Sequence, residues 1–179
     1  FQIVCSKLEL KPGSYKPKPK LKLSPLGRTD QALRSILRAS TMVMDLNQQG
    51  TIEAPDTEFL HDFRVACRRA RSALNQLKGV FTPEQIEDFR DDFAWLSDRT
   101  GPTRDLDVYL LDFNSYQAQL PEEQQADLEA FRELLQTENA KEKKLLAKDL
   151  QSKRYQNFRS NWENFLTDPT PSTTTGGAA

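Results

Sequence analysis

From about residue 28 to residue 166 the chain repeats a single pattern, in which apolar residues recur at helical spacing between residues that begin or end helices. In the first such stretch Leu33, Leu37 and Met44 share one face. Strand signals do not compete in this part of the chain. We therefore predict an all-α fold, an antiparallel bundle of about five to six helices joined by short loops.

Local signals place the helix ends. Thr82-Pro83-Glu84-Gln85 has the form of a helix start with a capping box, and Gly79 is suited to end the helix before it. The helices are expected to begin near residues 28, 57, 82, 103, 121 and 152, and the first, second, third, fifth and sixth to end near 50, 78, 101, 150 and 166.

The two ends of the chain have other compositions. Residues 1–24 form an extended segment, with a strand signal over 1–11 followed by a linker rich in lysine and proline. Residues 25–168 form the helical domain. Residues 169–179 are rich in Thr, Pro, Gly and Ala and are expected to be disordered.

The helix that starts near residue 57 carries an unusual group of cations, which we call the basic ladder: His61, Arg64, Arg68 and Arg71. At about 100° per residue these four side chains fall within an arc of about 80°. An apolar seam that includes Phe63, Cys67 and Leu74 lies beside it. Because like charges on one edge repel, such a ladder is kept most readily when an anion, the protein's own or a foreign one, lies against it.

Two sources of that anion remain open from spacing alone. Arginine donates paired hydrogen bonds to phosphate, so the ladder suits a linear polyanion. Alternatively, an internal ion-pair network satisfies it, since the next helix carries Glu84, Glu87, Asp88, Asp91 and Asp92. Arg104, in the first turn of the fourth helix, is free to face the ladder, and Lys141, Lys144 and Lys148 form a second basic face on the fifth.

Enzyme chemistry finds no support in the sequence, so no catalytic residue, metal or cofactor is predicted. His61 is the only histidine, and it diverges from Cys67 by about 120° on the same helix. Asp105 and Asp107 point about 160° apart, which argues against a two-carboxylate metal site. We expect helix capping and arginine pairing there instead.

Composition sets further bounds. The 179-residue chain has 25 Lys and Arg against 26 Asp and Glu, a net charge of −1, so anion binding must be local and nucleic acid is disfavoured. Two distant cysteines indicate reduced thiols and a cytoplasmic location. No apolar run is long enough to span a membrane.

The segment HDFRVACRRARSALNQLKGVF, followed by WLSDRTGPTRDLDVYLLDF, resembles the CHAD family, the conserved histidine α-helical domain. The resemblance covers about residues 25–168. It implies a helical domain that binds inorganic polyphosphate through a basic surface, often at polyphosphate granules. It also implies a set of ligands: His61, Arg64, Arg68, Arg71 and Arg104, with Lys144 and Lys148 as outer contributors.

The resemblance also implies a limit. The complete CHAD domain holds two helical repeats that face each other across a basic channel, and this chain resembles the first repeat. A second repeat or a second copy would complete the site. Residues 6–11 resemble the last strand of a CYTH domain, a triphosphate hydrolase. The alternatives are thus an interaction module whose arginines pair with carboxylates, or an accessory domain of such a hydrolase.

Overall fold

The structure, a computed structural model, describes residues 21–54, 56–77, 79–125 and 127–167. These residues form helices and connecting turns without any strand, which confirms the all-α prediction. The strand signal and CYTH-like segment at residues 1–11, most of the predicted linker and the predicted disordered tail lie outside the described residues. Among the described residues, no helix has the length and apolar character needed to cross a bilayer.

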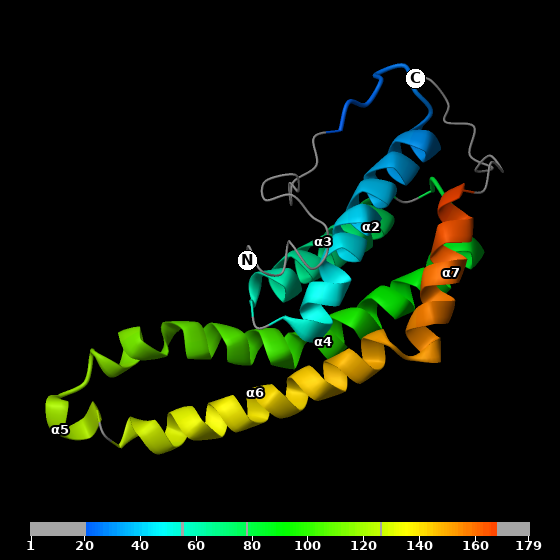
Figure 1. Ribbon diagram of the computed structural model, residues 1–179. Helices are drawn as coiled ribbons and strands as arrows, with labels where there is room; N and C mark the ends of the chain where they lie inside the picture. Colours follow the sequence, from blue (N-terminus) through cyan, green and yellow to red (C-terminus); the bar gives the residue numbers. More distant parts are fainter. Residues whose placement is uncertain (1–20, 55, 78, 126, 168–179) are drawn as a thin grey trace.

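Five helical segments form the main core (Figure 1): α2 (Thr29–Glu53), α3 (Glu58–Gln76), the first half of α4 (Pro83–Gln117), α7 (Lys153–Thr167) and the end of α6 (Leu128–Leu150), which contributes Leu146 and Leu150. Trp162 of α7 is fully buried and its ring meets Phe93 of α4 with centroids 5.1 Å apart. The indole Nε1 donates to Thr41 Oγ1 of α2 at 2.8 Å, so the buried polar atom is satisfied.

Contact between α2 and α3 depends on a glycine inside α2. Gly50 was expected to end this helix, but α2 continues to Glu53 and Gly50 is buried within it. A Cβ atom added at Gly50 would lie 2.3 Å from the ring of Phe59 in α3. The glycine is therefore a site of close helix approach and not a terminator.

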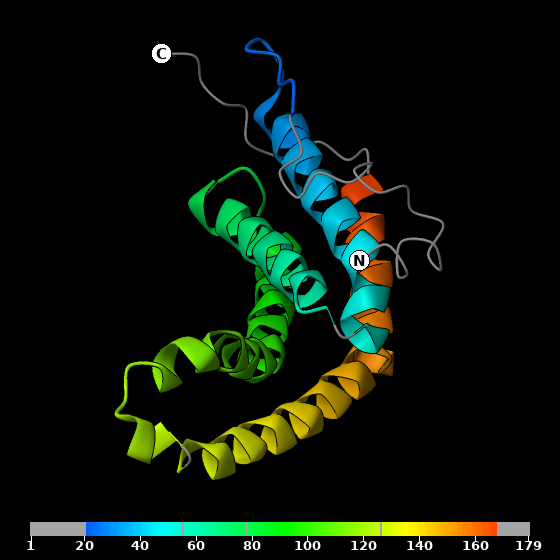
Figure 2. The same ribbon diagram turned by 60° about the vertical axis from the view of Figure 1, so that its left-hand side comes forward.

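Helix α4 is one continuous helix, so the prediction of two helices separated at Gly101-Pro102 is wrong. Thr82 and Pro83 begin it as predicted, and the backbone N–H of Thr82 donates to Gln85 Oε1 at 2.9 Å. Pro102 lacks the N–H that would bond the carbonyl of Asp98, but a proline can bend a helix without ending it. Figure 2 shows α4 changing direction between its two halves.

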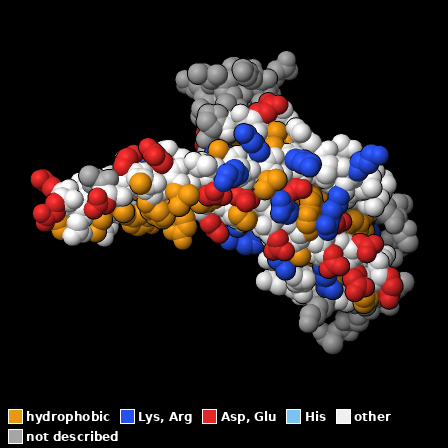
Figure 3. All heavy atoms as spheres, turned by 90° about the horizontal axis from the view of Figure 1, so that it is seen from below, with side chains coloured by type: hydrophobic (Ala, Val, Ile, Leu, Met, Phe, Trp, Pro, Cys, Tyr) orange, Lys and Arg blue, Asp and Glu red, His pale blue; other side chains and the backbone are white. Residues whose placement is uncertain are grey.

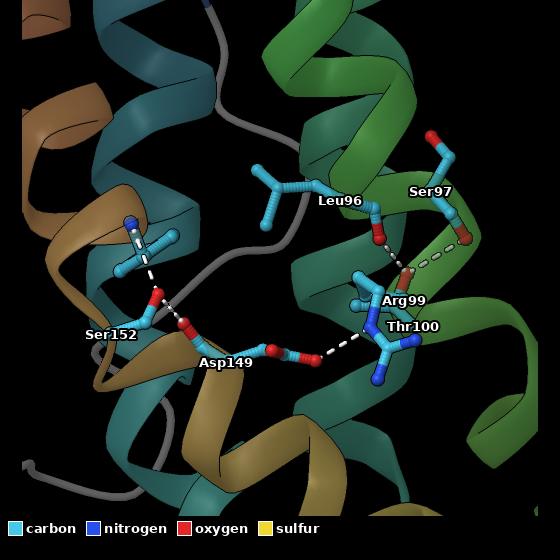
Figure 4. Close-up of polar contacts among 7 residues, drawn as sticks. Leu96, Ser97, Arg99, Thr100, Asp149 and Ser152 are labelled. Carbon is cyan, nitrogen blue, oxygen red and sulfur yellow. Dashed lines mark hydrogen bonds and ion pairs between the residues drawn. The ribbon is translucent and has the colours of Figure 1, made fainter.

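The second half of α4 leaves the core and runs antiparallel to α6 (Leu128–Leu150). Paired contacts fix this alignment, because Arg99 Nε lies 2.5 Å from Asp149 Oδ2 (Figure 4) and the rings of Phe113 and Phe131 lie tilted to each other, with centroids 6.4 Å apart. We call residues 105–143 the arm.

At the tip of the arm, α5 (Glu122–Gln125) and α6 are separate helices, whereas one helix from Pro121 to Leu150 was predicted. In the turn between them, side-chain amides donate hydrogen bonds to backbone carbonyls. Gln117 Nε2 donates to the carbonyl of Gln125 at 2.9 Å, and Gln125 Nε2 donates to the carbonyl of Leu120 at 3.0 Å. These bonds close the turn that allows α6 to return along α4.

Helix α7 begins after Ser152, as predicted. The backbone N–H of Tyr155 donates to Ser152 Oγ at 3.3 Å, and Ser152 Oγ donates to the carbonyl of Asp149, the residue that also pairs with Arg99 (Figure 4). One short segment thus joins α4, α6 and α7 and places the arm relative to the core.

Candidate anion-binding site

A hollow of about 370 Å³ lies between α3 and α4. All four members of the basic ladder line it, and Arg104 of α4 joins them from the opposite side. The remaining lining residues are uncharged: Val65, Cys67, Ser97, Thr100. The structure therefore brings together five of the seven residues that sequence analysis selected, in a hollow with no carboxylate in its lining.

Helix geometry explains why the ladder faces this hollow. The apolar seam of α3, including Phe63, Cys67 and Leu74, is buried in the core. That orientation leaves the ladder at the edge of the core, where Arg68 and Arg71 are exposed and Arg64 is half-buried. Burial of one stripe of α3 thus fixes the direction of the neighbouring cations.

Arg64 is held by α4. Its Nη1 donates to Thr100 Oγ1 at 2.9 Å and to the carbonyl of Ser97 at 3.3 Å. The Thr100 hydroxyl itself donates to the carbonyl of Leu96 at 2.6 Å (Figure 4), so its lone pairs are directed toward the guanidinium. Gly101 lies beside this contact, and a Cβ there would be in ordinary van der Waals contact with Arg64 Nη1, at 3.6 Å.

Arg104 is anchored from the other wall. Its Nη1 lies 3.4 Å from the carbonyl of Thr57, the residue before α3. The side chain is half-buried. Two arginines from two helices are therefore oriented by neutral oxygens, which hold them in place without neutralising their charge.

The electrostatic environment of the hollow is unfavourable for its own cations. Burial lowers the pKa of the Arg64 guanidinium, and Asp105 opposes this change. Arg104 and Arg68 lower that pKa further. Since arginine stays protonated at ordinary pH, the cost appears as strain between like charges that a bound anion would relieve.

The five acidic residues near the start of α4 do not supply that anion. None of the five acidic residues proposed as an internal network forms an ion pair with the ladder or Arg104, and Asp92 instead lies 3.6 Å from Arg154 Nη2 of α7. The internal network considered from the sequence is thus wrong for these carboxylates.

Lys144 and Lys148, the predicted outer contributors, are exposed on α6 and do not line the hollow. Helix α6 turns Leu146, Leu150 and Asn139 toward the interior. At about 100° per residue, Lys144 and Lys148 lie more than about 100° from that buried stripe. The structure places both on the outer face of α6.

The two aspartates of the Arg-Asp-Leu-Asp motif have separate environments, as their angular separation predicted. Asp105 is exposed, whereas Asp107 is buried and pairs across the arm. Asn139 Nδ2 donates to Asp107 Oδ1 at 3.0 Å, and Lys143 Nζ lies 3.1 Å from the same oxygen. Among the described residues, no three His, Cys, Asp or Glu side chains are placed to hold a metal ion.

Two further residues that line the hollow, Ser97 and Thr100, were not predicted as site residues. These residues precede Arg104 by seven and four positions, which is the spacing of one helical face. The same angular argument that defined the ladder would have identified them had α4 been predicted as a single helix. Cys67 also reaches the hollow, but burial raises the pKa of its thiol, which makes it a poor nucleophile.

The fold and the hollow together define a helical domain with a hollow lined by cations between α3 and α4. Residues 35–179 match the CHAD domain family, and the chain belongs to that family. The chain is similar to the solved structure of the CHAD domain from the plant Ricinus communis, with 26% identity and a TM-score of 0.66. The similarity covers 86% of this chain and 52% of that domain, so this chain spans about half of its length. No curated protein matches the chain.

Proposed function

We propose that this domain binds inorganic polyphosphate in the hollow between α3 and α4, as a non-catalytic module. The observation that carries the proposal is the lining: four arginines and the only histidine of the chain surround about 370 Å³ without a carboxylate. Planar guanidinium groups bind phosphate oxygens in pairs, and a chain of phosphates offers such oxygens repeatedly. Membership of the CHAD family agrees with this ligand.

The arrangement also suits the shape of a linear polyanion. Arg64, Arg68 and Arg71 follow one another along about two turns of α3, and Arg104 stands across the hollow from them. An extended phosphate chain that follows α3 would meet one cation after another. We expect Lys144 and Lys148 to contribute little, because α6 holds them outside the hollow.

The test is a titration of long-chain polyphosphate against the wild-type domain and an Arg64/Arg68/Arg71→Ala variant. Loss of three guanidinium groups should weaken binding by about 100-fold or more at low salt. Equal affinities would contradict the proposal. A matched control, Lys22/Arg28/Lys153→Ala, removes three exposed cations elsewhere and should bind nearly as well as the wild type.

A second comparison separates the rival functions. If the ladder serves a protein partner through carboxylates, the wild-type domain will not bind polyphosphate at all. If the domain assists a CYTH hydrolase, it will bind the polymer and require that enzyme for turnover.

Competition between RNA and polyphosphate measures the selectivity of the domain for its polyanion, and we expect polyphosphate to displace RNA. Location at polyphosphate granules is part of the same proposal.

A further inference from the structure

Asp107 is a buried carboxylate that follows Arg104 by one turn of α4. Its side chain is 2% exposed, and it lies three residues beyond Arg104, about 60° away around the helix. Arginine and aspartate at this spacing are neighbours on a helix surface and readily form an ion pair. Such a pair would neutralise the cation that α4 contributes to the hollow. Helix α4 therefore carries a competitor for any anion that Arg104 could bind.

Helix α6 directs Asp107 to other partners. Lys143 Nζ lies 3.1 Å from Asp107 Oδ1, and Asn139 Nδ2 donates to the same oxygen at 3.0 Å. Arg104 Nη1 instead lies 3.4 Å from the carbonyl of Thr57, the residue before α3. The carboxylate is thus held on the side of α6, and the guanidinium is held at the hollow.

The second oxygen of Asp107 makes the charge of Lys143 important. Oδ2 is buried and has no hydrogen-bond partner among the described residues. A buried carboxylate that loses its neutralising partner is unfavourable, so it attracts a cation within reach. Lys143 supplies the neutralising charge through a half-buried side chain. If that charge is removed, Arg104 is the guanidinium that the spacing along α4 offers to Oδ2.

We infer that Lys143 is a positioning residue for the anion-binding site, although it does not line the hollow. It neutralises Asp107 from α6 and so leaves Arg104 available to an anion in the hollow. The effect on binding rests on the proposed function, whereas the partner of Arg104 can be observed without polyphosphate. A lysine outside the hollow thus determines how many guanidinium groups the hollow offers.

The free protein provides the first test, by heteronuclear NMR of the arginine side chains. The Nε–H signal of Arg104 is identified by its absence from Arg104→Ala. We expect Lys143→Gln to shift this signal, because Arg104 then pairs with Asp107. Asp107→Asn/Lys143→Gln also removes the competing carboxylate and should return the signal to its wild-type position. A signal that does not move in Lys143→Gln overturns the inference.

Polyphosphate titration measures the consequence for binding. Loss of Arg104 to Asp107 removes one phosphate contact, so Lys143→Gln should bind about fivefold more weakly at about 0.1 M salt. Asp107→Asn/Lys143→Gln should recover the wild-type affinity to within about twofold, although it also lacks the ion pair between α4 and α6. Equal weakening of the single and the double variant would show that only this link matters, and it would overturn the inference.

Lys141→Gln is the matched control for lost charge. Figure 3 shows exposed Lys and Arg side chains where the arm joins the rest of the molecule, so loss of any lysine there lowers the local charge. Lys141 lies two residues before Lys143 and pairs with Glu138 of the same helix. Its substitution should change affinity by less than about twofold. A loss equal to that of Lys143→Gln overturns the inference.

The two readouts separate the inference from the proposed function. A wild-type domain that does not bind polyphosphate contradicts the proposed function, and the NMR signal of Arg104 still decides whether Lys143 controls its partner. Circular dichroism of each variant shows whether the helices remain intact.

Discussion

Arg64 shows how a single side chain can be prepared for an anion. Its guanidinium is oriented by Thr100 Oγ1 and the carbonyl of Ser97, both on another helix. A side chain that is already ordered loses less conformational entropy when a ligand binds. The remaining N–H groups of the fork stay available to the hollow.

Replacing Thr100 with valine tests this preorganisation. Thr100→Val keeps the β-branched shape but removes the oxygen that accepts from Arg64. We expect polyphosphate affinity to fall by roughly fivefold, equivalent to about 1 kcal/mol. Isothermal titration calorimetry of the two proteins measures the change.

Ser97→Ala provides the control for that experiment. The Ser97 hydroxyl also belongs to a residue of the hollow, but it donates to the carbonyl of Phe93 and not to Arg64. Its removal should leave affinity nearly unchanged. A similar loss in both variants would show that orientation of Arg64 is unimportant.

Helical spacing predicted individual residues well where one helix determines the outcome. It placed His61 and the three arginines of α3 together correctly. Helical spacing does not account for Arg34, which is 5% exposed, with its guanidinium carbon 5.0 Å from the centre of the Phe81 ring. Arg34 Nη1 also donates to the carbonyl of Phe165. Those partners come from distant parts of the chain, so angles on one helix cannot reveal them.

At the scale of elements, α2 and α3 approach each other closely at Gly50, where an added Cβ would lie 2.3 Å from the Phe59 ring. An exposed helical glycine usually becomes more stable when replaced by alanine, because alanine restricts the unfolded chain. Here the added methyl group would overlap the buried ring of Phe59. The steric effect opposes the entropic one.

We predict that Gly50→Ala lowers the free energy of unfolding by about 1–3 kcal/mol, since overpacking forces the two helices apart. Urea denaturation followed by circular dichroism measures this value. Gln49→Ala, at an exposed neighbouring position, should be neutral or slightly stabilising. Combining Gly50→Ala with Phe59→Leu should recover part of the loss, and an additive loss would argue against the clash.

Element prediction succeeded where local signals agree with packing. The Thr82–Gln85 capping box and Ser152 begin helices in the structure as predicted. The Gly101-Pro102 pair predicted a helix end that the structure does not have, because contacts between α4 and α6 continue on both sides of it. Arg99 pairs with Asp149 before the proline, and Asp107 binds Asn139 after it, so α6 supports both halves of α4. The residues next to Gly101 and Pro102 in the sequence give no sign of these contacts, because their partners on α6 lie far along the chain.

Across the whole molecule, charge is segregated although the total is only −1. Four guanidinium groups share the hollow, while the arm tip is acidic. Long-range attraction of a polyanion to the entire surface is therefore weak, and binding should depend on the number of local contacts.

Salt dependence measures that number. We predict that the logarithm of polyphosphate affinity falls with the logarithm of salt concentration with a slope of about −3, for about four neutralised phosphates. The Arg64/Arg68/Arg71→Ala variant should give a slope of about −1. Fluorescence anisotropy at a series of salt concentrations provides both values. A slope unaffected by the substitutions would place the contacts outside the hollow.

Pro102 lies where α4 passes from the core into the arm, so a bend of α4 at this proline moves the whole arm. From Pro102 to Gln117, α4 extends for about 22 Å, at 1.5 Å per residue. A bend of about 10° at the proline displaces the end of α4 by about 4 Å. The same small bend therefore sets how far the apolar side chains of the arm, such as Phe113, lie from the basic hollow beside α3.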